Sequence, residues 1–280
     1  MTETKSVTET RLRVAAAQMV SAATVEPNLR AAEELIAQAA AAGAQLVALP
    51  EYFCLMGRKE TDKVAAREAD GHGPIQDFLA RQAERQHVWL VGGTVPLIAS
   101  ETARVMNSTL VFSPSGQRVA RYDKVHLFAF QHGEESYEEA RTIMPGASVT
   151  TFELAAPGGP TLKIGLSVCY DLRFPELYRA MGQPDLILIP SAFTETTGRA
   201  HWDTLVKARA IENLCYVLAP AQGGRHENGR ETYGHSLLVD PWGRVVDKRA
   251  EGAGIVIGDV DLTVIAECRE RLPALKHRVF

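Results

Sequence analysis

The sequence predicts one α/β domain, with two layers of β-sheet and helices on the outside. Short apolar runs alternate with Ala-, Leu- and Glu-rich segments along nearly all of the chain, which is the pattern of strands and helices in turn. No linker, low-complexity tract or simple repeat divides the 280 residues. We therefore expect residues 11–280 to form a single domain and the polar residues 1–10 to form a flexible tail.

The first half of the chain alternates two expected helices with short strands. One helix covers residues 27–42, where apolar residues recur at helical spacing before a stop at Gly43, and the other covers residues 74–86. Strands are expected at residues 12–20, 45–49, 88–92 and 108–112. The Ser-Pro-Ser-Gly turn at 113–116 predicts that residues 117–122 pair back as a hairpin.

The second half resumes this alternation after residues 128–145, which are expected to be irregular. Pro175 and Gly182 bracket a helix at 174–181, because proline suits the first helical turn and glycine the end. Two more helices are expected at 201–213 and from about Asp261. The remaining strands are expected at residues 162–168, 186–189, 216–219, 236–239 and 255–260, giving roughly ten strands or more.

Composition and cysteine spacing exclude several classes of protein. The hydrophobic share of 46% does not fit a disordered chain, and the net charge of −4 lacks the cationic surplus of a nucleic-acid binder. The apolar runs are far shorter than the ~20 residues of a membrane span, and the start lacks the pattern of a signal peptide. The four cysteines form no C-x-x-C pair, and no metal-ligand or nucleotide-binding motif is present. A cytoplasmic protein without metal or cofactor is the expectation.

Functional side chains follow the ends of several expected strands. Glu51 and Cys169 each come directly after such a strand, where α/β folds gather their functional groups. Cys169 is the best candidate nucleophile, because nearby free N–H groups and a helix dipole would lower the pKa of its thiol. The alternative is an inert buried cysteine, which is how we interpret Cys54, Cys215 and Cys268.

Other charged residues have both a catalytic and an ordinary interpretation. Glu51 is either a proton-transfer group in a desolvated cleft or a strand-end charge. Lys124 closes a strand, and its ammonium would stabilise an oxyanion unless it is simply solvated. Arg173 would bind a substrate carboxylate through its planar fork, or brace Asp171 or Glu176. The acidic run at 134–139 gives no local reason to separate Glu138 from Glu139.

Three motifs in order resemble the nitrilase superfamily of carbon–nitrogen hydrolases. They are Leu-Pro-Glu-Tyr-Phe at 49–53, Tyr-Asp-Lys-Val-His-Leu-Phe at 122–128 and Val-Cys-Tyr-Asp-Leu-Arg-Phe-Pro-Glu at 168–176. The resemblance covers almost the whole chain. It implies a Glu–Lys–Cys triad of Glu51, Lys124 and Cys169. It also implies a four-layer α-β-β-α sandwich that assembles as a homodimer or a higher homo-oligomer.

Within that superfamily, the finer resemblance is to amidases of the deaminated-glutathione and ω-amidase type. It rests on residues 191–193, 197–198, 201–202, 207–213, 233–236, 240–243 and 272–278. This resemblance assigns the additional glutamate to Glu139, although the usual following serine is Ala140 here and Glu138 stays open. By the same resemblance, Arg173, Thr197 and Tyr170 contact substrate.

The expected activity is therefore hydrolysis of the amide of a small carboxylate substrate, deaminated glutathione first, by way of a thioester. Acid and an ammonia-type product would be released without a cofactor. Alternatives are an ω-amidase acting on 2-oxo acid amides, another amidase, a nitrilase or an N-carbamoyl hydrolase, because the triad alone does not decide among them. A non-catalytic interaction protein on the same fold is the alternative of a different class.

Overall fold

The computed structural model describes residues 10–133, 135–156 and 158–279. Most of the expected tail, residues 1–9, lies outside these described residues. Thr10 is described, and its carbonyl accepts a hydrogen bond of 3.0 Å from the backbone N–H of Leu262. Whether residues 1–10 form a flexible tail stays a prediction.

Six α-helices and eighteen strands are assigned within the described residues. The helices are α1 (Val25–Ala41), α2 (Asp62–Ala65), α3 (Pro74–Gln86), α4 (Pro175–Ala180), α5 (Glu195–Asn213) and α6 (Leu262–Arg271), with short 3₁₀ turns η1 (Glu139–Arg141), η2 (Cys169–Arg173) and η3 (Ala274–Lys276). The strands are β1 (Arg11–Gln18), β2 (Leu46–Ala48), β3 (Trp89–Val91), β4 (Val95–Ile98), β5 (Val105–Phe112), β6 (Arg118–Asp123), β7 (Ala129–His132), β8 (Glu135–Glu138), β9 (Ile143–Met144), β10 (Thr150–Ala155), β11 (Thr161–Leu166), β12 (Leu186–Leu188), β13 (Tyr216–Ala219), β14 (Gly223–Arg225), β15 (Glu231–Tyr233), β16 (Ser236–Val239), β17 (Val245–Arg249) and β18 (Gly254–Asp261).

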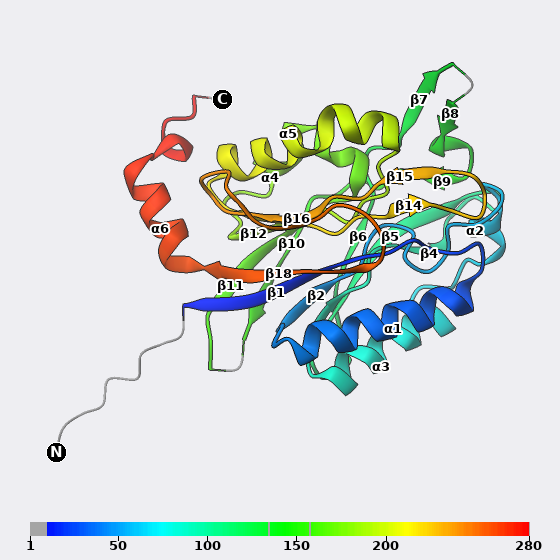
Figure 1. Ribbon diagram of the computed structural model, residues 1–280, viewed down its shortest axis with the longest axis horizontal. Helices are drawn as coiled ribbons and strands as arrows, with labels where there is room; N and C mark the ends of the chain where they lie inside the picture. Colours follow the sequence, from blue (N-terminus) through cyan, green and yellow to red (C-terminus); the bar gives the residue numbers. More distant parts are fainter. Residues whose placement is uncertain (1–9, 134, 157, 280) are drawn as a thin grey trace.

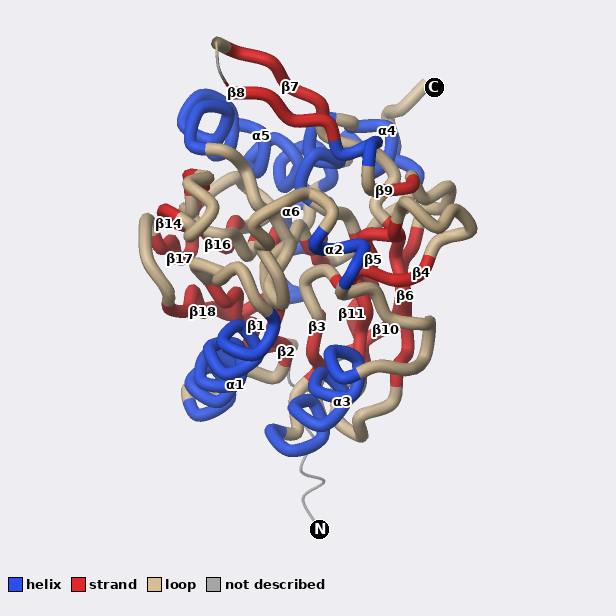
Figure 2. Tube along the Cα trace, turned by 90° about the vertical axis from the view of Figure 1, so that its right-hand side faces the viewer, coloured by secondary structure: helices blue, strands red, loops and turns tan. Residues whose placement is uncertain are grey.

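Two large sheets lie face to face between two layers of helices (Figure 1). The first sheet has the order β18-β1-β2-β3-β5-β4, with β6 and β9 also paired to β5, and the second has the order β10-β11-β12-β13-β16-β17. Helices α1 and α3 cover one outer face, and α4 and α5 cover the other, an arrangement that the turned view also shows (Figure 2). The expected four-layer α-β-β-α sandwich is confirmed.

The hydrophobic core follows these layers. One cluster joins the inner faces of both sheets and continues beneath α4 and α5, with Trp202 of α5 fully buried in it. A second cluster fills the space between the first sheet and helices α1 and α3. Alternate residues of β1 divide between the clusters: Val14 faces the other sheet and Ala15 faces the helices. This burial on both faces fits the short, nearly continuous apolar strands.

Equivalent parallel strands in the two sheets place the candidate residues. Strands β1, β2 and β3 run parallel in the first sheet, and β11, β12 and β13 do so in the second. The carboxyl ends of β2 and β11 lead to Glu51 and Cys169. Both side chains therefore follow strands whose last three residues are buried.

Two expectations about secondary structure were wrong. Residues 128–145, expected to be irregular, contain the β7–β8 hairpin, which projects beyond α5 (Figure 1). Its strands are largely exposed and lack apolar alternation, so periodicity does not reveal them. Helix α5 begins at Glu195 rather than at residue 201, capped by Thr194. Gly198 weakens the helical pattern of the sequence there. A larger residue would not fit at this position, because its Cβ would lie 2.3 Å from the Tyr233 side chain.

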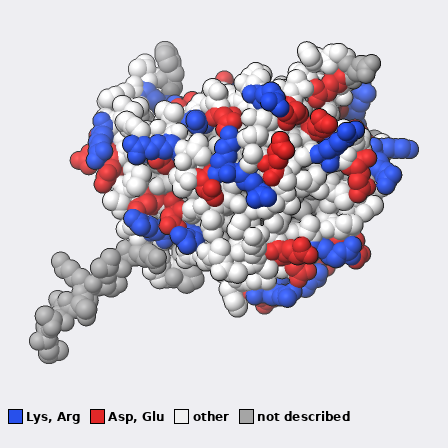
Figure 3. Space-filling model, in the orientation of Figure 1, with Lys and Arg blue, Asp and Glu red and all other residues white. Residues whose placement is uncertain are grey.

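The surface has no large area of one charge on the face shown in Figure 3, where acidic and basic side chains are interleaved. No helix in the described part of the chain is long and apolar enough to cross a membrane.

Candidate active site

Lys124 lies at the centre of the site. It follows β6, and its side chain is fully buried. Its Nζ donates to Glu51 Oε1 at 2.8 Å and to both oxygens of Glu139 at 2.9 and 2.7 Å. Burial lowers the pKa of Lys124, but the charges of Glu139 and Glu51 outweigh that effect and raise it above its usual value. The lysine is therefore a permanent buried cation held by two carboxylates.

Glu51 is held from both its backbone and its side chain. Its carbonyl accepts a hydrogen bond from Gln222 Nε2 at 3.0 Å, and its Oε1 accepts another from Asn107 Nδ2 at 3.0 Å. Gly93 permits the close chain approach behind it, because a Cβ there would lie 2.0 Å from the Pro50 carbonyl oxygen. The second carboxylate oxygen, Oε2, is buried without a hydrogen-bond partner among the described residues. One oxygen of Glu51 is thus free to accept a proton.

Glu139 reaches the same lysine from the base of the β7–β8 hairpin. Its Oε1 accepts a hydrogen bond from Tyr52 Oη at 2.7 Å, and its Oε2 accepts one from the backbone N–H of Phe128 at 2.8 Å. Burial raises the pKa of Glu139, but Lys124 and the N–H of Phe128 hold it below its usual value. Glu138, in contrast, is exposed and pairs with Arg141 at 2.8 Å. The structure thus places Glu139, and not Glu138, at the site.

Cys169 opens the 3₁₀ turn η2 with a left-handed backbone, φ 49°. Its N–H donates to the carbonyl of Pro190 at 2.9 Å, so the turn is tied to the end of β12. Burial and the negative charge of Glu51 raise the pKa of the thiol well above its usual value, with Lys124 opposing them. The expected lowering of the thiol pKa is wrong, because burial and Glu51 raise it more than Lys124 lowers it. The resting thiol is therefore protonated.

The carboxylate of Asp171 links the segments that carry Lys124 and Cys169. It accepts hydrogen bonds from Tyr122 Oη at 2.7 Å and from the backbone N–H groups of His126 at 3.0 Å and Val168 at 2.8 Å. Its Oδ1 also lies 2.7 Å from His126 Nδ1. Two of these partners flank Lys124 in sequence and one precedes Cys169. The buried Asp171 therefore fixes the nucleophile turn against the lysine strand.

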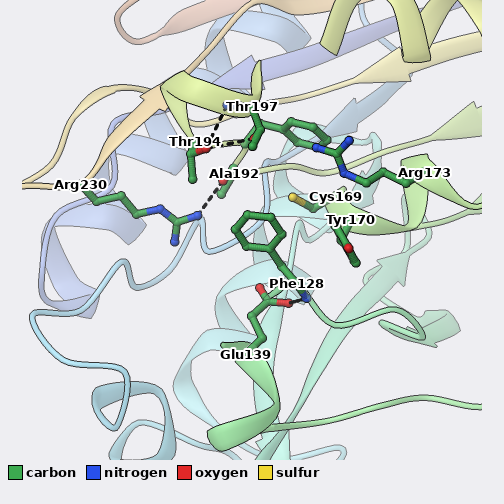
Figure 4. Close-up of a pocket in the computed structure, with 10 residues that line it drawn as sticks. Phe128, Glu139, Cys169, Tyr170, Arg173, Ala192, Thr194, Thr197 and Arg230 are labelled. Carbon is green, nitrogen blue, oxygen red and sulfur yellow. Dashed lines mark hydrogen bonds between the residues drawn. The ribbon is translucent and has the colours of Figure 1, made fainter. Parts of the chain in front are cut away.

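A small pocket lies over Cys169 and Glu139 (Figure 4). Aromatic side chains line much of it, and Tyr170, Arg173 and Thr197 are also part of its lining. Arg173 contacts His201 Nδ1 at 3.3 Å and lies over the rings of Tyr170 and Phe193. It forms neither of the expected ion pairs with Asp171 or Glu176, and Asp171 pairs with His126 instead. The hydroxyl of Thr197 lies 3.0 Å from that of Thr194 at the start of α5.

The structure thus brings the sequence-predicted residues together in one site, while their catalytic roles stay proposals. Sequence reasoning missed Asn107, Tyr52 and Arg230 as members of the site. Tyr52 lies inside the Leu-Pro-Glu-Tyr-Phe motif, so its position beside Glu51 was a usable signal. Asn107 and Arg230 have no local signal, because a polar residue in a strand and an arginine after a Gly229 turn are both ordinary surface patterns.

Other reactive groups lie elsewhere in the described chain. Cys54 and Cys215 are buried in the two hydrophobic clusters, and burial raises the pKa of both thiols. Within residues 10–133, 135–156 and 158–279, no three His, Cys, Asp or Glu side chains are placed to hold a metal ion.

Comparison with known proteins identifies the family. The family described as carbon-nitrogen hydrolase matches residues 13–270. The chain belongs to the carbon–nitrogen hydrolase family. It is 40% identical over 270 residues to a deaminated glutathione amidase from Synechocystis, covering 95% of this chain and 97% of that protein. This match confirms the family resemblance noted in the sequence. It also confirms the expectation that the protein is a hydrolase acting on amide C–N bonds.

Solved structures of the family share the fold. Nit3 of Saccharomyces cerevisiae, a member of the nitrilase superfamily, superposes with a TM-score of 0.86 at 30% identity, covering 97% of each chain. A variant amidase from Nesterenkonia superposes with a TM-score of 0.78 at 25% identity, covering 96% of this chain and 94% of its own. In that amidase, the acetamide moiety of fluoroacetamide is added covalently at the active-site cysteine. A cysteine nucleophile is therefore a feature of a related carbon–nitrogen hydrolase.

Proposed function

We propose that this hydrolase cleaves the amide of deaminated glutathione with Cys169 as its nucleophile. The observation that carries the proposal is the free Oε2 of Glu51, a buried proton acceptor whose charge acts on the protonated thiol of Cys169. The substrate assignment is supported by the relative from Synechocystis and by one from Homo sapiens, 38% identical over 271 residues, both described as deaminated glutathione amidases.

The proposed reaction has two steps. Glu51 takes the thiol proton as the sulfur of Cys169 attacks the amide carbon, and the proton then passes to the leaving nitrogen. Lys124 and the backbone N–H of Tyr170 hold the oxyanion, a contribution of roughly 10²–10³ in rate for each such donor. The C–N bond breaks and leaves a thioester. Glu51 next deprotonates a water, which Glu139 helps to orient, and its attack releases the acid and restores the thiol.

The nitrogen product depends on the substrate. In deaminated glutathione, the amide nitrogen beside the 2-oxo acid part carries the cysteinylglycine part, so an amine leaves rather than free ammonia. A 2-oxo acid primary amide, the substrate of the ω-amidase alternative, would release ammonia. Arg173 suits both substrates, because each presents a carboxylate on the acyl side of the scissile bond.

Replacement of the nucleophile tests this function. Cys169→Ala should reduce hydrolysis of deaminated glutathione by about 10⁴-fold or more while the thermal unfolding midpoint stays close to that of wild type. Cys268→Ala is the matched control, because Cys268 lies on α6, outside the site. Retained turnover in Cys169→Ala would contradict the assignment of the nucleophile.

We further propose that the protein is a cytoplasmic homodimer or higher homo-oligomer. The cytoplasmic location is supported by four free cysteines in the described chain, which suit a reducing compartment. Self-association is supported by exposed apolar residues near the ends of α5 and α6: Ile211 and Trp242 are 47% and 51% exposed, and Ile211 contacts the Gly243 turn. Light scattering after size exclusion should give at least twice the chain mass of 30.5 kDa.

A further inference from the structure

A second guanidinium enters the pocket from the side opposite Arg173. Arg230 lies between β14 and β15 and lines the pocket together with Glu139 and Cys169. In Figure 4, Arg230 and Arg173 approach from opposite sides, with Cys169 between them. The two guanidinium groups therefore lie on opposite sides of the nucleophile.

The contacts of Arg230 leave part of its hydrogen-bonding capacity unused. Its Nη2 donates to the carbonyl of Ala192 at 2.7 Å, and its guanidinium lies 5.1 Å from the ring centre of Tyr137 and 5.9 Å from that of Tyr52. Its Nε is buried and has no hydrogen-bond partner among the described residues. A buried donor of a charged group is expensive to leave unpaired, and it calls for an acceptor.

No carboxylate of the described residues serves as that acceptor. Arg230 and Arg173 form no ion pair with any acidic side chain in the described ranges. Glu139, the acidic residue of the pocket lining, has both oxygens occupied by Lys124, Tyr52 and Phe128. The lining therefore presents two cations and no free anion.

We propose that Arg230 binds a carboxylate on the leaving-group half of the substrate, and that this contact determines which amides the enzyme prefers. The inference rests on the proposed function, in which Arg173 takes the carboxylate of the 2-oxo acid half. Deaminated glutathione carries a second carboxylate, on the terminal glycine beyond the scissile amide. A guanidinium recognises such a group through its fork of N–H donors. A 2-oxo acid primary amide has no group for Arg230 to bind.

Two matched substrates test the contact: deaminated glutathione, and the same molecule with its terminal glycine carboxylate converted to a carboxamide. The wild-type ratio of kcat/KM, acid over carboxamide, should be roughly 10 to 100, the effect of losing one charge-assisted hydrogen-bond pair. In Arg230→Gln, this ratio should fall close to one. In Arg230→Lys, which keeps the charge but loses the fork, it should take an intermediate value.

Two further variants separate the subsite from general effects. Arg173→Gln should lower kcat/KM for both substrates yet keep the wild-type ratio, because Arg173 binds the 2-oxo acid half, which the two substrates share. Arg225→Gln alters an exposed arginine on the same hairpin, 4.0 Å from Glu231, and should behave as wild type. A merely structural role of Arg230 would lower kcat/KM for both substrates equally and leave the ratio unchanged, which would overturn the proposal.

The outcomes also separate this inference from the proposed function. A wild-type ratio near one overturns the carboxylate contact whatever the variants do, so the proposal does not depend on the folding of Arg230→Gln. Hydrolysis of 2-oxo acid primary amides but of neither matched substrate also overturns it, while leaving an amidase. A wild-type protein inert on all three substrates overturns the proposed function and the inference together.

Discussion

Two regions of the molecule deliver a carboxylate to the same lysine, and they differ in almost every other respect. Glu51 leaves the fully buried strand β2, whereas Glu139 stands at the base of the largely exposed β7–β8 hairpin. Both bind Lys124 Nζ at hydrogen-bonding distance. Glu51, however, keeps one buried oxygen without a partner, whereas both oxygens of Glu139 are occupied.

This difference suits the two carboxylates to different roles. An acid whose two oxygens already accept several hydrogen bonds is a poor proton acceptor, because protonation would break those contacts. Glu139 is therefore suited to holding Lys124 and the Phe128 segment in place. The free oxygen of Glu51 is suited to exchanging a proton with the thiol and the leaving nitrogen.

The largest expected loss of stability comes from removing the lysine that joins the two regions. Lys124→Met should lower kcat by about 10²–10³-fold through the lost oxyanion donor alone. It also leaves two buried carboxylates without their cation, so the free energy of unfolding should fall by about 3–5 kcal/mol. Urea unfolding measures this loss, and unchanged stability would mean that the two carboxylates do not depend on Lys124.

The pH dependence of the free energy of unfolding tests the interaction between Lys124 and Glu139. Because the folded pKa of Glu139 is lowered, its contribution to stability is present above the unfolded pKa of about 4.3 and is lost as pH falls through the folded value. In Lys124→Met, the largest cause of that lowering is gone. The variant should therefore lose less stability than wild type on acidification, measured by urea unfolding from about pH 6 to pH 3.

A smaller effect is expected at the hairpin carboxylate. Glu139→Gln keeps acceptor and size but loses the charge, so kcat/KM should fall roughly 10- to 100-fold. Glu138→Gln is the matched control, because Glu138 is exposed and makes only a surface pair with Arg141; its activity should stay within about twofold of wild type. Equal losses in both variants would contradict the placement of Glu139 at the site.

The smallest effect concerns the accessibility of the thiols. Cys169 lines the pocket, whereas Cys54 and Cys215 are enclosed in the hydrophobic clusters. Iodoacetamide should label Cys169 at least about tenfold faster than either of them, as peptide mass spectrometry can measure. Faster labelling of a core cysteine would instead support a non-catalytic role for the pocket.

The same two regions show what a sequence reveals. The strand-end residues Glu51 and Cys169 could be predicted, because a buried strand has a clear apolar pattern and its carboxyl end is where functional groups gather. The parallel strands and most helices followed from the same periodicity. The β7–β8 hairpin could not be predicted, since its polar, exposed strands owe their pairing to backbone hydrogen bonds rather than to a buried face.

Contacts between segments that are distant in the sequence could not be predicted either. Only the fold shows that Glu139 rather than Glu138 faces Lys124, that Asn107 supports Glu51, and that Arg230 enters the pocket. The pKa of Cys169 was predicted in the wrong direction for the same reason. A local argument considered the following helix, but burial and the charge of Glu51 outweigh it in the folded protein.

The most direct test of the central claim measures two properties of one variant, Glu51→Gln. Because the charge of Glu51 raises the thiol pKa, its removal should move the pH profile of Cys169 alkylation to lower pH. Turnover of deaminated glutathione should nevertheless fall by about 10²–10⁴-fold, because no group remains to carry the proton. An unshifted alkylation profile together with near wild-type turnover would contradict the account.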